Sequence, residues 1–122
     1  MRQVLLFAAA GLLTVNMAAA QDSRSLPPEA QSLIACYLAT ATSIGKTACE
    51  RPSALTGEVF EKCSGQEQAL IDAVKIRYKG LPDMIAGELA KASLKKIREK
   101  MASQVQSWIL KSRIKEKICQ GR

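Results

Sequence analysis

The chain has 122 residues, of which 18 are basic and 11 acidic, with four cysteines and no histidine. This length suits one domain with a modest core, for which covalent cross-links matter. The lack of histidine removes the commonest general base and the usual serine–histidine and cysteine–histidine nucleophile pairs. Aromatic residues make up only 4% of the chain, so aliphatic and alanine side chains must provide most of the packing, which favours helices over a sheet.

Residues 1–20 have the three parts of a secretory signal peptide. Arg2 gives the N-terminal region its positive charge, and residues 4–15 form an uncharged apolar stretch. Small residues up to Ala20 then form the cleavage site. The alternative is a membrane anchor. Asn16 and the polar segment after the alanines stop the apolar run short of the roughly 20 residues that a spanning helix needs. We therefore expect cleavage after Ala20.

Cleavage would leave a flexible lead at residues 21–26 and a single helical, disulfide-linked domain at residues 27–122, either periplasmic or secreted. No later stretch of the sequence is apolar enough to span a bilayer, so no transmembrane segment is expected in the mature protein. An exported chain meets an oxidising compartment, in which its cysteines can form disulfides.

Apolar residues recur at three- and four-residue steps in segments 28–44, 53–79 and 83–118, which glycine- and proline-containing loops separate. The second segment contains Ser64 and Gly65, weak helix formers that predict a kink or brief break there. Short loops make consecutive helices antiparallel. We predict an all-α fold: a three-helix antiparallel bundle with a long C-terminal helix and two disulfides, preceded by a cleaved signal helix.

The apolar stripe of the third segment changes face along its length. At about 100° per residue, Ile85 and Ile114 both lie on roughly the opposite side of the helix from Met101. Either the helix bends or splits near residues 90–93 and 109–111, or it contacts neighbours on more than one side.

The four cysteines predict two disulfides, for which three connectivities exist. At about 1.5 Å per residue, Cys36 lies about 12 Å before the first interhelical loop and Cys63 about 15 Å after it, so the two are level. Cys49 lies in that loop, which the end of an antiparallel third helix approaches, and its partner is then Cys119. We predict Cys36–Cys63 and Cys49–Cys119, for which loop-closure entropy gives about 3.5 and 4 kcal/mol. The alternative role for Cys119, which has lysines nearby, is that of a labile thiol.

Neither a metal site nor a cofactor site is expected. The cysteines are 13, 14 and 56 residues apart, so the chain has no C-x-x-C pair for zinc or c-type haem. Ser93 with Lys96, and Glu58 with Glu61, are conceivable catalytic pairs, but such pairs are common on solvated helix faces. We therefore expect that the protein is not an enzyme.

Positive charge is concentrated in the C-terminal third of the chain. Residues 21–90 carry 7 basic and 9 acidic side chains, whereas residues 91–122 carry 10 basic and 2 acidic ones. The simpler interpretation, which we prefer here, is a solvated helix face that keeps the domain soluble. The other is a surface for an anionic envelope component or an acidic protein. Its predicted partner-binding residues are Lys95, Lys96, Arg98, Lys100, Trp108, Lys111 and Arg113.

These patterns predict a small exported helical protein that acts as a binding or structural module through its basic amphipathic third helix. Nucleic acid fits the charge but not the exported location. One alternative is a membrane-surface protein whose third helix lies on anionic lipid. Another, less supported, is an enzyme without a recognisable motif. Trp108 is either a partner anchor or part of the core, and the sequence leaves the oligomeric state open.

Overall fold

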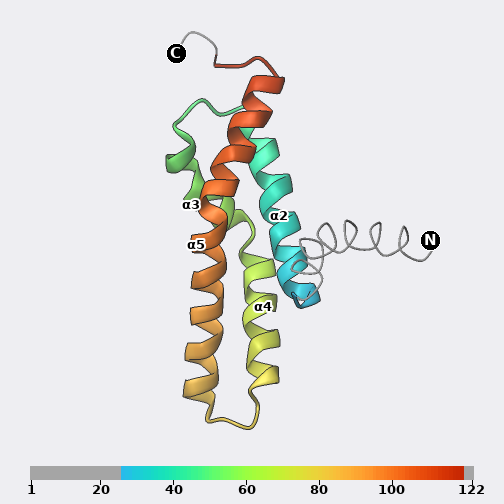
Figure 1. Ribbon diagram of the computed structural model, residues 1–122, viewed down its shortest axis with the longest axis vertical. Helices are drawn as coiled ribbons and strands as arrows, with labels where there is room; N and C mark the ends of the chain where they lie inside the picture. The colour runs from blue at the N-terminus through green and yellow to red at the C-terminus, as the bar shows by residue number, and fades with distance from the viewer. Residues whose placement is uncertain (1–25, 120–122) are drawn as a thin grey trace, which may run out of the picture.

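A computed structural model describes residues 26–119, and the predicted signal peptide at 1–20 lies outside this range. Within it the chain forms helices and loops but no strand. Helix α2 runs in one direction, α3 and α4 return, and α5 runs back along the molecule beside them (Figure 1). None of these four helices combines the length and apolarity needed to cross a bilayer. The helices are α2 (Pro28–Gly45), α3 (Pro52–Lys62), α4 (Ser64–Arg77) and α5 (Asp83–Lys115).

Proline marks the start of three helices. Pro28 and Pro52 are the first residues of α2 and α3, and Pro82 immediately precedes α5. The fixed φ of proline suits the first helical turn, where its missing N–H would have no helical partner. At the start of α2, the carbonyl of Pro27 accepts a hydrogen bond from the backbone N–H of Ala30 at 3.0 Å. The predicted start of the first helix is confirmed.

The break predicted at Ser64 and Gly65 is confirmed, and it divides the segment that was predicted as one helix over residues 53–79 into two, α3 and α4, which meet at Cys63. This residue has φ −99° and ψ 18°, outside the helical geometry. Two causes coincide there. Ser64 and Gly65 weaken the helix immediately afterwards, and a disulfide to Cys36 holds Cys63 against α2. The described fold is therefore an assembly of four helices and not of three, with α3 and α4 together forming the returning arm.

Helix α5 is continuous over 33 residues, so the split considered near residues 90–93 and 109–111 does not occur. The helix packs against α2, α3 and α4, which confirms the alternative that it has neighbours on more than one side. It ends three residues before the predicted Ile118. Lys117 adopts a φ of 56°, and the N–H of Ile118 donates to the carbonyl of Arg113 at 3.2 Å, the pattern of a Schellman motif.

The core lies where α2 faces the other three helices. Its largest fully buried side chains include Leu33 and Tyr37 of α2. Those of the other helices are Val59, Leu70, Val105 and Ile109. Three apolar residues of the middle of α5 are partly buried and pack against this cluster: Leu94, Ile97 and Met101.

Both predicted disulfides are present. Cys36 pairs with Cys63 at a Cα–Cα distance of 6.0 Å, and Cys49 pairs with Cys119 at 5.6 Å. All four cysteines lie in the described part of the chain, and each is bonded there, so none is a free thiol. The first bridge joins α2 to the α3–α4 junction. The second joins the α2–α3 loop to the segment after α5, as the antiparallel geometry requires.

The end of α2 and the last third of α5 approach so closely that only glycine fits at residue 45. A Cβ at Gly45 would lie 2.5 Å from the carbonyl oxygen of Ile109 and 2.8 Å from the Cβ of Ser112. The Ser112 hydroxyl also donates to the carbonyl of Thr42 at 2.6 Å across the same contact. This end of the bundle is thus fixed by a backbone-to-backbone contact.

We predict that Gly45→Ala lowers the free energy of unfolding by about 1–3 kcal/mol, because the new methyl group meets backbone that cannot move aside. Gly57→Ala is the matched control. A Cβ at Gly57, in the exposed face of α3, meets nothing within 4 Å, so the change should raise stability by about 0.5–1 kcal/mol through helix propensity. Urea unfolding of both variants measures this. Equal effects of the two substitutions would contradict the close contact.

Candidate functional site

A groove of about 710 Å³ lies between the start of α2, α4 and the middle of α5. Its volume falls within the range typical of ligand sites, about 300–1,000 Å³. Buried or partly buried apolar side chains from all three helices form its floor. They are Ala30, Ile34, Leu70, Val74, Ile97 and Met101.

Three exposed cations border the same groove. Arg77 belongs to the last turn of α4, and Lys96 and Lys100 lie one turn apart on α5. Among residues 26–119, none that lines the groove is acidic, so no described carboxylate neutralises the positive charge within it. An apolar floor with a cationic border suits a molecule that is itself apolar at one end and negatively charged at the other.

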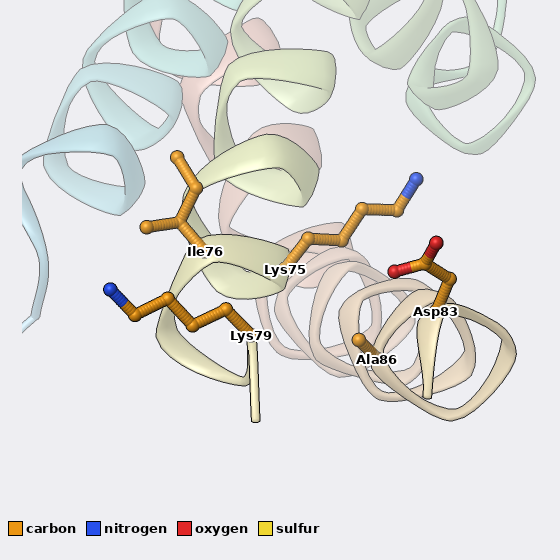
Figure 2. Close-up of a pocket in the computed structure, with 5 residues that line it drawn as sticks. All are labelled: Lys75, Ile76, Lys79, Asp83 and Ala86. Carbon is orange, nitrogen blue, oxygen red and sulfur yellow. The ribbon is translucent and has the colours of Figure 1, made fainter. Parts of the chain in front are cut away.

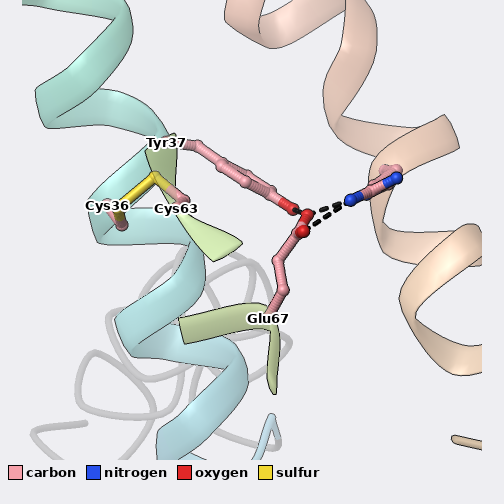
Figure 3. A network of polar contacts seen from close by, with 5 residues as sticks. Cys36, Tyr37, Cys63 and Glu67 are labelled. Atoms are coloured by element: carbon pink, nitrogen blue, oxygen red, sulfur yellow. Dashed lines mark hydrogen bonds and ion pairs between the residues drawn. A yellow bond between two sulfur atoms is a disulfide. The ribbon is translucent and has the colours of Figure 1, made fainter. Parts of the chain in front are cut away.

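Beside the first disulfide, a buried carboxylate joins three helices (Figure 3). Glu67 of α4, only 4% exposed, accepts a hydrogen bond from the Tyr37 hydroxyl of α2 at 2.5 Å. Arg98 of α5 donates to the same carboxylate through Nε at 2.7 Å and Nη2 at 2.5 Å. The Arg98 guanidinium also lies 5.2 Å from the ring centroid of Phe60, a cation–π geometry.

These contacts shift two pKa values. Burial raises the pKa of the Tyr37 hydroxyl well above its usual range, and the hydrogen bond to Glu67 and the charge of that carboxylate raise it further. The hydrogen bond to Glu67 also raises the pKa of Arg98, against the opposing effect of burial. Tyr37 therefore stays protonated as a donor, and Arg98 stays charged. The network links α2, α4 and α5 through polar contacts, since all of its donors are directed at the one carboxylate of Glu67.

The structure places the seven predicted partner-binding residues in different environments. Lys95, Lys96, Lys100 and Lys111 are exposed on α5, and of these only Lys96 and Lys100 line the groove. Trp108 is partly buried and packs against the core.

Arg98 and Arg113, two of the predicted partner-binding residues, form contacts within the domain, and the side chain of Arg98 stays 42% exposed. Arg98 binds Glu67 as described. Arg113 donates through Nη2 to the carbonyls of Ala48 at 2.8 Å and Glu50 at 2.7 Å. These two residues flank Cys49, so Arg113 holds the loop that carries the second disulfide.

The residues considered as catalytic pairs lie in ordinary helical contacts. The Ser93 hydroxyl donates to the carbonyl of Leu89 one turn earlier, at 3.0 Å. Glu58 forms an exposed ion pair with Lys62 at 3.4 Å.

Sequence analysis missed Glu67, Tyr37 and Arg77. Glu67 had a detectable signal, because it lies four residues after Cys63 and three before Leu70, on the apolar stripe of its segment. A carboxylate at a core position requires buried partners, so this placement predicts an internal ion pair. Arg77 had no such signal, since it lies in the part of the chain whose net charge is slightly negative.

The comparisons with known proteins add no functional information. Neither protein family models, nor curated proteins, nor solved structures match this chain.

We predict that Glu67→Ala lowers the free energy of unfolding by about 1–3 kcal/mol, because it leaves the buried hydroxyl of Tyr37 and the partly exposed guanidinium of Arg98 without their acceptor. Glu58→Ala is the control, since it removes an exposed helical pair with Lys62 and should cost at most about 0.5 kcal/mol. Urea unfolding at neutral pH compares them. A cost for Glu67→Ala as small as that of the control would show that the network contributes little.

Proposed function

We propose that this protein is an exported binding protein for an anionic amphiphile, a molecule with a negatively charged head group and an apolar chain. The observation that carries the proposal is the groove between α2, α4 and α5. Its apolar floor would receive the chain, and Arg77, Lys96 and Lys100 at its border would bind the head group. We propose a binding role and not a catalytic one.

The charge distribution supports an anionic ligand in particular. The three cations come from two different helices, so they surround a head group from two sides. Lysine and arginine at a groove attract anions over several ångströms and raise their rate of association. A neutral apolar molecule would use the floor alone and leave these charges without a role.

Export is proposed on separate grounds. The signal pattern of residues 1–20 predicts it. The two disulfides support it, because such bridges persist in oxidising compartments such as the periplasm or the extracellular space. An envelope contains anionic amphiphiles in the form of acidic lipids, so the proposed location and ligand agree.

The test uses two lysolipids with the same acyl chain, below their critical micelle concentrations. Isothermal titration calorimetry should show that the purified protein binds lysophosphatidylglycerol, which is anionic, and binds lysophosphatidylcholine, which is zwitterionic, at least about tenfold more weakly. The Lys96→Glu/Lys100→Glu variant should lose at least about tenfold in affinity for the anionic lysolipid, because attraction at the groove becomes repulsion.

The matched control is Lys95→Glu/Lys111→Glu. It changes the net charge equally and also lies on exposed positions of α5, but neither residue lines the groove. The control should retain most of the affinity. Equal losses in the two variants would exclude the groove as the site, and equal binding of the two lysolipids would exclude the preference for an anionic ligand.

A further inference from the structure

Exposed apolar side chains gather at one end of the molecule, around the turn between α4 and α5. Met84 is 81% exposed and Ile76 is 69% exposed, although both are large apolar residues. Tyr78, Leu81 and Ile85 are also at least 40% exposed. We call residues 75–85 the hairpin tip. It lies at the lower end of the molecule in Figure 1, beyond the start of α2.

The hairpin tip also carries positive charge. Lys75, Arg77 and Lys79 alternate with its apolar residues, and Asp83 is its one acidic residue. Figure 2 shows Lys75 and Lys79 extending to opposite sides of the end of α4, with Lys75 on the side of Asp83. A hollow of about 440 Å³ lies between these side chains. The tip is thus apolar at its turn and cationic around it.

We propose that the hairpin tip inserts into the surface of an anionic lipid bilayer. Apolar side chains that enter the boundary between head groups and acyl chains to about 5–10 Å would be removed from water there. Tyrosine is enriched at the membrane–water interface, and lysine and arginine near the surface are attracted to acidic head groups. Arg77 also borders the groove, but the exposed apolar side chains of the tip do not line it, so the inference goes beyond the proposed function and does not depend on it.

A bilayer fits this tip better than a folded protein partner does. The apolar residues lie in the turn and in the adjoining ends of α4 and α5, and such a projecting end would need a matching pocket in a protein, whereas a bilayer accepts it without one. The cations supply the charge complementarity that an acidic membrane requires. The hairpin would then stand on the membrane, with the disulfide between Cys49 and Cys119 at the far end of the molecule.

Tryptophan fluorescence can report the position of the tip, because the chain has one tryptophan. The reporter is the full-length protein with Trp108→Phe and Met84→Trp. On addition of vesicles of equal parts phosphatidylglycerol and phosphatidylcholine, its emission should shift to shorter wavelength. Vesicles of phosphatidylcholine alone should leave the emission unchanged. The absence of a shift with the anionic vesicles would overturn the proposal.

Co-sedimentation with the same vesicles provides the second measurement. Met84→Ser/Ile85→Ser should reduce partitioning onto anionic vesicles at least about tenfold, whereas Leu110→Ser/Ile114→Ser, which changes exposed apolar residues of α5 away from the tip, should leave it nearly unchanged. Equal losses would overturn the proposal. So would a dimer that forms without lipid and disappears in the tip variant, because the tip would then bind a second copy.

Discussion

The arrangement of α2, α4 and α5 depends on the buried carboxylate of Glu67. A carboxylate removed from water is costly unless it is paired and hydrogen-bonded, and here the partners come from two other helices. Helices α2, α4 and α5 can satisfy it only when Tyr37 and Arg98 both reach it. The network therefore specifies how these helices are aligned and rotated relative to one another, in addition to any stability that it contributes.

The rotation of α5 links this network to the proposed binding groove. Lys96 and Lys100 lie two residues before and after Arg98, which places them about 200° around the helix from it. Because Arg98 is directed at Glu67 and Phe60, the two lysines lie on another side of α5, where they border the groove. The orientation that the ion pair of Arg98 with Glu67 gives to α5 thus goes together with the placement of Lys96 and Lys100 at the groove.

The two ends of the bundle are held very differently. At one end, the disulfide between Cys49 and Cys119, the hydrogen bonds of Arg113 and the glycine contact at Gly45 fasten α5 to α2 and its loop. At the other end, the α4–α5 turn carries no disulfide and exposes apolar side chains. The fastened end also exposes Leu110 and Ile114, but exposed apolar residues are more numerous at the turn, where we propose the contact with a bilayer.

The sequence was sufficient to predict the helices, their antiparallel order and both disulfide pairings, because these follow from local periodicity, loop length and the rise of a helix. It was not sufficient to predict features that depend on how each helix is rotated about its axis and on distances between side chains of different elements. Ser64 and Gly65 predict a break near Cys63, but not that it divides the segment into two separate helices. Arg98 and Arg113 look like surface cations in the sequence, and only the packed structure shows their acceptors on other elements.

The state of the Tyr37 hydroxyl tests the central network most directly. In Tyr78→Phe, Tyr37 is the one tyrosine left in the chain, so phenolate absorbance reports on it alone. Its raised pKa means that its stabilising effect is complete below about pH 10, where a tyrosine in the unfolded chain titrates, and is lost as the pH rises further. Alkaline titration, followed together with circular dichroism, should show phenolate appearing well above pH 10 and only as the helices unfold. Phenolate formation with a midpoint near pH 10 in the folded protein would contradict the buried network.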